Sequence, residues 1–420
     1  MRILVCNAFY YPRGGAEVCA LDLESLLVSK GHEIISFSVE HPRNLPSPYS
    51  SYFPSYIDYP ELLKNVNPSN IFRATERIIF CRETRDKLSQ LIKNIKPDLA
   101  HVHNVGHELS PSALYAIADA QIPIVRTVHD FGLLCPNSSF LSHGELCERC
   151  KGGRYYQVVL RRCKRNSLPA SLLAALGSYT HSFLKSHQTK VDVFLAPSAF
   201  LRQKLISFGY PEEKIKHLPN AIKVSGFEPS FNPGSYALYF GRLSYEKGLH
   251  TLLKAMAYLP NAPLIIAGEG PLGNELKDYA RKIGLGNVQF VGYQTGKALH
   301  DLIRNSAFTI MASECYENAP LACIESMALG RSVVGSNIGG IPELVKDERT
   351  GLLFEPRNAE DLSRKINYLL GNPALQIEWG KNARTQIETM FDSERHYQAL
   401  LEIYQQLLKK YQKGCVQVPK

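Results

Sequence analysis

Residues 308–345 read FTIMASECYENAPLACIESMALGRSVVGSNIGGIPELV, and this stretch decides the predicted fold. The apolar run Phe308–Met311 predicts a buried strand, and the polar residues after it predict a loop. Pro320 suits the first turn of a helix, because its missing N–H group would lack a partner there anyway. A second strand is expected at Ser332–Ser336, followed by Gly339–Gly340. Strand, loop, helix, strand and glycine loop are the order of a parallel sheet that binds ligand at its strand ends.

Two glutamates stand in this stretch, Glu317 in the loop and Glu325 eight residues later on the helix. Two helix N-termini and a glycine turn are expected to converge here, which suits a phosphate group. An ordinary α/β unit with one surface glutamate and one half-buried glutamate fits this stretch equally well. The choice between these interpretations needs the rest of the chain.

Length and composition predict a globular protein of several domains. With 420 residues the chain is too long for one ordinary core, so two or three domains are expected. The N-terminal residues MRILVCNAFY enter a strand-like run at once, so we expect no signal peptide. No run of 18 apolar residues exists, so no spanning helix is predicted. These features predict a cytoplasmic protein whose ten cysteines are mostly reduced.

The first half of the chain starts like a doubly wound sheet. A strand at Arg2–Ala8 is followed by a loop with Gly14–Gly15, a helix and a second strand at Glu33–Val39. A later strand, Pro123–His129, ends in a histidine. Ligands bind at the carboxyl ends of strands in open sheets, so His129 is a candidate site residue, with a structural histidine as the alternative.

A second doubly wound unit starts after a linker. Residues 225–234 contain two prolines and two glycines without periodicity, which predicts the linker. The strand Tyr236–Phe240 then runs into GRLSYEKG at 241–248. Arg242 and Lys247 in this loop supply a guanidinium fork and a point charge, which together suit a diphosphate. Solvated charges at a helix start are the alternative interpretation.

The segment 135–165 is an insertion with an unusual number of cysteines. Cys147 and Cys150 have the spacing of a zinc knuckle, and Cys135 and Cys163 flank them at 12 and 13 residues. Four thiolates close a tetrahedral site, so a structural zinc is expected. An iron–sulfur cluster or four free or paired thiols are the alternatives.

The segment 151–190 carries eight Lys or Arg residues and no Asp or Glu. Within it, Leu168–Phe183 is apolar and predicts an interfacial helix. A basic patch beside such a helix is typical of a surface that binds anionic lipid. Nucleic acid is not expected as a partner, because the segment has no recognised nucleic-acid motif and the rest of the chain is nearly balanced in charge. A solvated basic face is the remaining alternative.

Together these motifs resemble the retaining glycosyltransferases of family 4, also called group 1, which have the GT-B fold. GRLSYEKG is similar to the donor-phosphate loop of that family, and Glu317 with Glu325 to its two-glutamate signature. Gly268–Pro271 and Phe290–Tyr293 are similar to its nucleotide-side turns. The resemblance implies an α/β protein with two Rossmann-like doubly wound domains facing across a cleft.

The resemblance also implies a domain plan. Residues 1–222 would be the acceptor-side domain with its insertion, and residues 235–393 the nucleotide-sugar domain. Residues 394–420 would be a helix that crosses back to the N-terminal domain. Closure of the two domains on donor binding would follow from the fold.

Roles for single residues follow from the same resemblance. Arg242 and Lys247 would hold the diphosphate, Glu325 the ribose and Glu317 the donor sugar, while His129 would lie over that sugar near the reacting carbon. The loop ENAP departs from the family's commoner glycine-rich loop, which leaves the sugar open. The remaining donor-binding positions that it implies are Gly15, Gly241, Gly268, Tyr293, Asn318, Ala319, Pro320 and Leu321.

The implied reaction moves a sugar from a UDP- or GDP-linked donor to an acceptor hydroxyl with retention of configuration. No cofactor is expected for catalysis, since Arg242 and Lys247 would neutralise the leaving diphosphate. The expected acceptor is a saccharide or a lipid-linked saccharide, in polysaccharide or lipopolysaccharide assembly at the inner face of a membrane. A nucleotide-sugar epimerase of this fold and a catalytically degenerate transferase acting as a scaffold are the alternatives.

Overall fold

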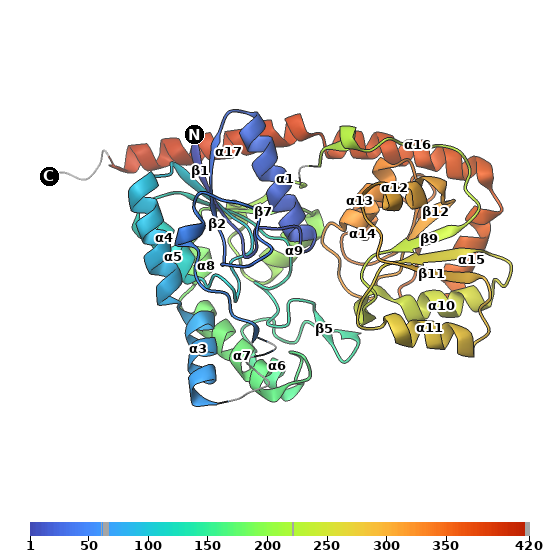
Figure 1. Cartoon of the computed structure of the whole chain (residues 1–420), viewed down its shortest axis with the longest axis horizontal. Helices are drawn as coiled ribbons and strands as arrows, with labels where there is room; N and C mark the ends of the chain where they lie inside the picture. The colour runs from blue at the N-terminus through green and yellow to red at the C-terminus, as the bar shows by residue number, and fades with distance from the viewer. Residues whose placement is uncertain (60, 62–66, 221, 416–420) are drawn as a thin grey trace. The chain divides into compact units, whose positions relative to one another are not determined.

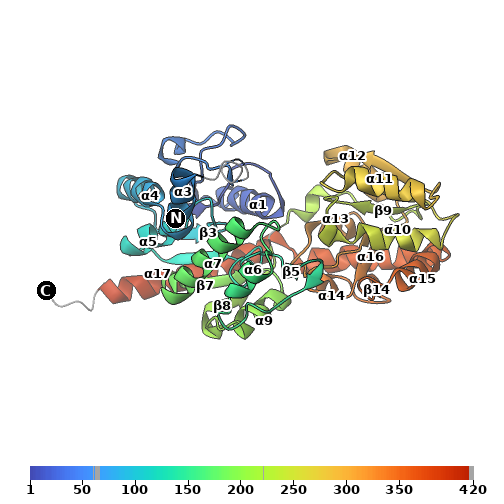
Figure 2. The same cartoon turned by 90° about the horizontal axis from the view of Figure 1, so that it is seen from below.

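The computed structural model describes residues 1–59, 61, 67–220 and 222–415. Contacts within the chain divide it into two compact units. Unit 1 holds Met1–Ile222 and Ser393–Lys420, and unit 2 holds Lys223–Asp392. Each unit contains a six-stranded parallel sheet with helices packed against it (Figures 1 and 2).

The sheet of unit 1 has the strand order β2-β1-β3-β4-β7-β8. Its central strands are short apolar segments, because a parallel sheet covered by helices buries both of its faces. The strands are β1 (Arg2–Cys6), β2 (Glu33–Phe37), β3 (Leu99–Val102), β4 (Ile124–Thr127), β7 (Val193–Ala196) and β8 (Ile215–His217), and a separate antiparallel pair is formed by β5 (Leu141–Ser142) and β6 (Glu145–Leu146).

Helices of unit 1 begin where the sequence supplies a cap. The Ser198 hydroxyl accepts the Leu201 N–H at 3.1 Å, and the Asn67 side chain accepts the Asn70 N–H at 2.9 Å. The helices are α1 (Gly15–Ser29), α3 (Pro68–Ile79), α4 (Arg82–Ile95), α5 (Ser112–Asp119), α6 (Tyr156–Leu160), α7 (Leu168–Phe183), α8 (Ser186–Lys190), α9 (Ala199–Ser207) and α17 (Ser393–Cys415).

Residues Ile71–Lys96 have apolar side chains at helical spacing, and the structure forms two helices here, α3 and α4. The chain is extended at Phe80, and the Cys81 side chain caps α4 by accepting the Thr84 N–H. A break of this kind leaves no mark in the apolar spacing, which continues through both helices. The segment 41–70 is rich in Pro, Ser, Tyr and Asn, a composition that predicts a loop, and part of it lies outside the described residues.

The last helix, α17, packs on the sheet of unit 1. Leu400 and Tyr404 are fully buried in one apolar cluster with Ile3, Val5 and Leu99 of the central strands. This burial explains why the apolar positions of α17 recur at helical spacing. Among the described residues, every helix is too short or too polar to span a bilayer.

The sheet of unit 2 has the order β11-β10-β9-β12-β13-β14 and is covered on both faces. Its strands are β9 (Ala237–Phe240), β10 (Leu264–Ala267), β11 (Val288–Gly292), β12 (Phe308–Met311), β13 (Val333–Ser336) and β14 (Gly351–Phe354). Its helices are α10 (Leu249–Ala257), α11 (Gly273–Lys282), α12 (Gly296–Asn305), α13 (Leu321–Ala328), α14 (Ile341–Leu344), α15 (Ala359–Leu370) and α16 (Pro373–Met390).

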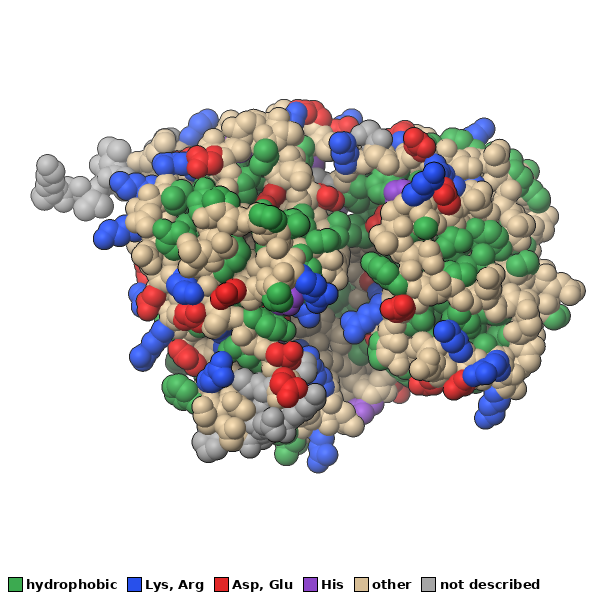
Figure 3. Space-filling view, in the orientation of Figure 1, with side chains coloured by type: hydrophobic (Ala, Val, Ile, Leu, Met, Phe, Trp, Pro, Cys, Tyr) green, Lys and Arg blue, Asp and Glu red, His purple; other side chains and the backbone are tan. Residues whose placement is uncertain are grey.

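Charged side chains of both signs are interspersed on the face seen in Figure 3. Lys and Arg side chains lie there among Asp and Glu side chains in both units. A net charge of +9 over 420 residues is consistent with this mixture.

Candidate active site

The strand order of unit 2 marks where a ligand is expected. β9 and β12 are neighbours at the centre of the sheet; β10 and β11 extend it on one side, β13 and β14 on the other. The loops that leave the carboxyl ends of β9 and β12 therefore diverge, and open α/β sheets bind ligands at such a point. The first loop carries Arg242 and Lys247, and the second carries Glu317.

Lys247 and Glu317 contact each other directly. The Lys247 Nζ donates to Glu317 Oε1 at 2.6 Å, and the Ser313 hydroxyl donates to the same oxygen at 2.6 Å. The Lys247 and Glu317 side chains are 26% and 13% exposed, so water screens this ion pair only in part. Two charge-assisted hydrogen bonds thus fix the carboxylate at the centre of the two loops.

Glu317 controls the protonation of the groups around it. Burial by itself would lower the pKa of Lys247, but the Glu317 carboxylate outweighs burial and raises it above the ordinary value. Burial raises the pKa of the Cys315 thiol to about 12, and Glu317 adds to this effect. At neutral pH the site therefore presents a protonated ammonium beside a neutral thiol.

Two glycines allow the loops of this site to approach each other. Gly248 has a φ of +67°, and a Cβ atom there would lie 1.9 Å from the carbonyl oxygen of Ala312. A Cβ atom on Gly340 would lie 1.8 Å from the carbonyl oxygen of Asn318, and the Gly340 N–H donates to the Glu317 carbonyl at 2.7 Å. The loops after β9, β12 and β13 are therefore in backbone contact, which only glycine permits here.

Glu314 supports the same loops and was missed by the sequence analysis. It accepts the Thr251 hydroxyl at 2.6 Å and pairs with Arg357 at 3.2 Å, while its N–H donates to the Glu246 carbonyl at 2.9 Å. The signal available was an acidic residue three positions before Glu317 in the same loop. Such a residue ties the loop after β12 to α10.

The other predicted donor residues of unit 2 lie at the same edge of the sheet. Arg242 is exposed, and its carbonyl accepts the Tyr239 hydroxyl at 2.9 Å. The Gly268 N–H donates to the Gly292 carbonyl at 2.7 Å, next to the exposed Tyr293. The remaining positions are Gly241 directly after β9, Asn318, Ala319, Pro320 and Leu321 at the amino end of α13, and Glu325 one turn into that helix.

His129 lies in unit 1, two residues after β4, in a group of three histidines. His129 Nε2 and His103 Nδ1 are 2.8 Å apart, and their rings stack, as do those of His103 and His101. His101 contacts the Tyr404 hydroxyl at 2.5 Å and the Thr127 hydroxyl at 2.7 Å. Burial lowers the pKa of His101 to about 3 and that of His129 to about 4, so these rings are neutral at neutral pH.

Gly15 lies at the ligand-binding edge of the other sheet. In unit 1 the direction of strand addition reverses between β1 and β3. The loop after β1 ends at Gly14, whose carbonyl accepts the Val18 N–H at 3.0 Å, and α1 begins at Gly15. The predicted loop with Gly14–Gly15 therefore occupies residues 7–14 and leads directly into the amino end of α1.

The expected zinc site is not supported by the arrangement of its cysteines. Cys150 lies within electrostatic range of the other three thiols, and burial followed by these thiols raises its pKa to about 12. The Cys163 thiol contacts the Ser142 hydroxyl at 3.5 Å. In the part of the chain that the structure describes, which includes Cys135, Cys147, Cys150 and Cys163, no three His, Cys, Asp or Glu side chains are placed to share a metal ion.

The insertion is instead held by aromatic packing. Phe140 is 1% exposed, and its ring lies 5.2 Å from that of Phe131 and 5.5 Å from that of Phe208. The expectation of a structural zinc rested on a loop too polar to pack by itself. The burial of Phe140 supplies apolar packing within the insertion without a metal.

Arg126 is a further residue that the sequence analysis missed. It lies in β4 and is buried, and its Nη1 contacts His187 Nδ1 at 2.6 Å. The signal was an arginine inside the apolar segment IPIVRTV. A charged residue within a buried strand calls for a partner or a ligand.

Known families and structures match the chain along its length. Residues 13–225 match the family described as Glycosyltransferase Family 4, and residues 226–386 match Glycosyl transferases group 1. The chain is 34% identical over 325 residues to a glycogen synthase of Mycobacterium tuberculosis, covering 74% of this chain and 69% of the relative. It is 27% identical over 207 residues to O-antigen chain mannosyltransferase C of Escherichia coli, covering 49% and 55%.

Solved structures with little sequence identity share the fold. Sucrose-phosphate synthase of Thermosynechococcus elongatus superimposes with a TM-score of 0.71 at 20% identity, covering 97% of this chain and 99% of the other. HepE of Anabaena in complex with UDP-glucose gives a TM-score of 0.64 at 19% identity, covering 97% and 100%. The fold predicted for the chain, two Rossmann-like units of the GT-B type, is thereby confirmed.

Proposed function

Because the chain belongs to the group 1 glycosyltransferases of family 4, we propose that it transfers a hexose from a nucleoside-diphosphate sugar to a saccharide acceptor with retention of configuration. The observation that carries this proposal is the pairing of Lys247 with Glu317 at the centre of unit 2. A cation and a carboxylate held at the ligand-binding edge suit a diphosphate and a sugar hydroxyl, respectively.

Five residues have proposed roles in the donor site. Arg242 and Lys247 bind the diphosphate, Glu317 binds hydroxyls of the donor sugar, Glu325 binds the ribose, and His129 contacts the transferring sugar. The neutral state of His129 supports a hydrogen-bonding role rather than a charged one. Backbone and ring contacts to the donor are proposed for Gly15, Gly241, Gly268, Tyr293, Asn318, Ala319, Pro320 and Leu321.

The proposed mechanism follows from where the negative charge develops. As the sugar–phosphate bond breaks, charge accumulates on the leaving diphosphate, and Lys247 and Arg242 stabilise it. The ammonium of Lys247 is held in place by Glu317 before the donor binds, so little reorganisation is needed. The acceptor hydroxyl attacks from the face of the leaving group, and its proton passes to the departing phosphate.

A donor screen tests the proposed reaction. UDP, GDP and their common hexose conjugates are added to the full chain, and the melting temperature is followed, because a bound ligand stabilises the folded state. The conjugate that binds is then incubated with and without an oligosaccharide acceptor, and the configuration of the product is read by NMR. Transfer with retention supports the proposal. Epimerised donor without acceptor would support the alternative enzyme, and no binding of any nucleotide would support a scaffold.

A second proposal concerns location: the enzyme is cytoplasmic and binds the inner face of an anionic membrane through residues 151–190, as in polysaccharide or lipopolysaccharide assembly. The exposed side of α7 carries Leu172, Leu176 and Phe183, the last of them 87% exposed. α3 packs beside α7 and exposes Phe72. Basic residues flank this apolar surface without acidic neighbours in the segment, which supports an anionic lipid partner.

Flotation with lipid vesicles tests the membrane proposal. The chain is expected to float with vesicles of phosphatidylcholine and phosphatidylglycerol but not with phosphatidylcholine alone, and high salt should release it. Phe183→Ser should weaken the binding, whereas Tyr258→Ser, at an exposed tyrosine of unit 2, should not. Equal binding to both kinds of vesicle, or to neither, would contradict this proposal.

A further inference from the structure

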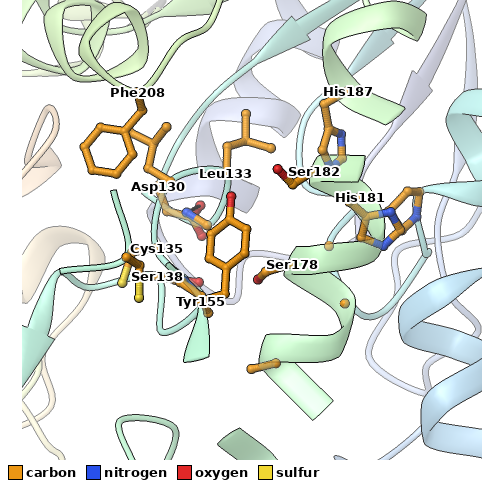
Figure 4. Close-up of a pocket in the computed structure, with 18 of the residues that line it drawn as sticks. Asp130, Leu133, Cys135, Ser138, Tyr155, Ser178, His181, Ser182, His187 and Phe208 are labelled. Atoms are coloured by element: carbon orange, nitrogen blue, oxygen red, sulfur yellow. Dashed lines mark hydrogen bonds between the residues drawn. The ribbon is translucent and has the colours of Figure 1, made fainter. Parts of the chain in front are cut away.

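Unit 1 contains a polar cavity that none of the proposed donor contacts uses. The cavity has a volume of about 530 Å³ and lies between the segment that follows β4, the inner side of α7, and α8. Figure 4 shows Ser178 and Ser182 of α7 facing Tyr155 across the cavity, with His181 and His187 at one end. A space of this size accommodates one or two sugar rings.

The end of the cavity near His187 carries a buried positive charge that forms no ion pair with another described residue. Arg126 is 6% exposed and lines the cavity, and its Nε has no hydrogen-bond partner among the described residues. Its Nη1 contacts His187 Nδ1 at 2.6 Å. No carboxylate of the described chain pairs with this guanidinium within 4 Å. A buried guanidinium without a counterion is costly, so the site suits an anionic group from outside.

The other charged groups around the cavity leave this positive end in place. Asp130 and Glu108 line the cavity; Asp130 lies within electrostatic range of both Arg126 and Lys164, and Glu108 within range of Lys164. The Asp130 carboxylate also accepts the Gly132 N–H at 2.8 Å. Lys185, an exposed residue, lines the cavity as well. Glu108 and Asp130 carry two negative charges and Lys164, Arg126 and Lys185 three positive charges, so these five groups together keep one positive charge.

Burial keeps the histidines of the cavity neutral. It lowers the pKa of His187 well below the usual value, with Arg126 adding to the effect, and it lowers the pKa of His181 as well. His187 Nδ1 can therefore accept a hydrogen bond from Arg126, which orients the guanidinium. The remaining N–H groups of Arg126 are left for a ligand.

The middle of the cavity suits a sugar ring. Hydroxyl groups of Ser138, Ser178 and Tyr155 line it, and the rings of Phe208 and Tyr210 add apolar faces. Hydroxyl donors beside aromatic rings are a combination that binds carbohydrates, because sugars have polar edges and apolar faces. An anionic group at one end and hydroxyls in the middle together describe an acidic saccharide.

We propose that this cavity binds the acceptor and selects one that carries an anionic group, a carboxylate or a phosphoryl, which Arg126 and Lys185 neutralise. This inference rests on the proposed function, since it names the class of acceptor for the same reaction. Arg126 acts in binding and takes no part in bond cleavage. Neutral saccharides would leave the guanidinium buried without a counterion, and this difference is the source of the selectivity.

Binding of three small probes to the full chain tests the inference. Methyl glucuronide supplies a carboxylate, glucose 1-phosphate supplies a phosphoryl group, and methyl glucoside is the neutral control. Ligand-observed NMR is expected to detect one or both anionic probes and not the neutral one. Whichever anionic probe binds identifies the source of the charge. Equal binding of all three probes, or of none, would overturn the proposal.

Variants locate the binding to the cavity. Arg126→Gln and Lys185→Asn should each lower the affinity for the anionic probe by about tenfold or more, which corresponds to a loss of ~1.4 kcal/mol in binding free energy. Asn suits position 185, because the backbone there has a φ of +48°. Arg82→Gln removes an exposed arginine of unit 1 outside both the cavity lining and residues 151–190, and should leave the binding of the anionic probe unchanged. If both cavity variants bind the anionic probe as tightly as the unaltered chain, the assignment is refuted. Two variants are used so that one interpretable result remains if the other folds poorly.

The same experiment separates this inference from the proposed function. Binding of UDP and GDP is measured on the Arg126→Gln variant and is expected to equal that of the unaltered chain. Displacement of the anionic probe by a nucleoside diphosphate would show that the cavity belongs to the donor and would overturn the inference. Nucleotide binding without any binding of an anionic saccharide would refute the inference and leave the transferase proposal standing.

Discussion

Replacement of Lys247 by alanine separates its role in catalysis from its role in folding. Lys247 pairs with Glu317 at 2.6 Å, and both side chains are partly exposed. Two unit charges 4 Å apart attract by about 4 kcal/mol at an effective dielectric constant of 20. Desolvation and the exposure of both side chains offset most of this attraction. We therefore expect the substitution to lower the free energy of unfolding by about 1–2 kcal/mol.

The expected effect on turnover is larger. Removing one preorganised donor from a developing oxyanion costs about 2.7–4 kcal/mol, or about 10²–10³ in kcat. A charge on the leaving diphosphate is a comparable case, because Lys247 would face it in a partly water-excluded loop. Lys247→Ala should therefore reduce kcat by about 10²–10³ and lower Tm by only about 2–8 °C.

Steady-state transfer assays and thermal unfolding of the same preparations test this prediction. Lys254→Ala is the matched control, since Lys254 is an exposed lysine on the adjacent α10. It should leave both kcat and Tm unchanged. Wild-type turnover in Lys247→Ala would refute the catalytic role of the ammonium. If activity is lost only in proportion to the unfolded fraction, the Lys247–Glu317 ion pair has a structural role alone.

Three further predictions follow from the geometry. Glu317→Gln should lower kcat at least about tenfold in the transfer assay, while calorimetry shows a smaller loss in the binding of the nucleoside diphosphate, because the carboxylate contacts the sugar directly and the phosphate only through Lys247; equal loss of both would contradict this division. Gly248→Ala should lower the free energy of unfolding, measured by urea denaturation, by at least ~1 kcal/mol, because its Cβ would lie 1.9 Å from the Ala312 carbonyl oxygen. Unit 1 should lose stability as the pH falls below about 6.5. Burial lowers the pKa of His101 to about 3 in the folded chain, so below about pH 6.5 the unfolded chain binds a proton that the folded chain does not. The free energy of unfolding should therefore fall by about 1.4 kcal/mol per pH unit for this residue. The Tyr404→Phe variant should keep the same pH dependence. A free energy of unfolding that stays constant between pH 7 and 5 would contradict the prediction.

The sequence predicted the sheets and their ligand-binding edges because local pattern controls both. Apolar runs such as Phe308–Met311 form strands wherever helices cover both faces. Glycine before or after a strand marks a loop that must approach another backbone, as at Gly248 and Gly340. These features depend on a few adjacent residues and on general steric rules, so a single sequence contains them.

Contacts that depend on distant residues were not predictable in the same way. The direct pairing of Lys247 with Glu317 joins positions 70 residues apart, and the family resemblance implied a separate role for each of them. The structure does not support the zinc expectation, because cysteine spacing alone carries no information on how the thiols are placed relative to one another. The break between α3 and α4 depends on one extended residue, Phe80, inside a continuous apolar spacing.

The cavity of unit 1 could not be predicted from the sequence. Arg126, His187 and Ser178 come from three elements, β4, α8 and α7, and no motif joins them in the sequence. An arginine in an apolar strand was a visible signal, but its meaning depends on whether a carboxylate of the fold pairs with it. That question can be answered only with the side chains in place.

Calorimetric titration of the full chain with UDP and with GDP is the decisive experiment for the donor site. We expect saturable binding of at least one of the two nucleotides at a single site, weakened strongly by Lys247→Ala and unaffected by Lys254→Ala. Absence of binding for both nucleotides, or equal binding by both variants, would contradict the assignment of the loops after β9 and β12 as the donor site of a glycosyltransferase.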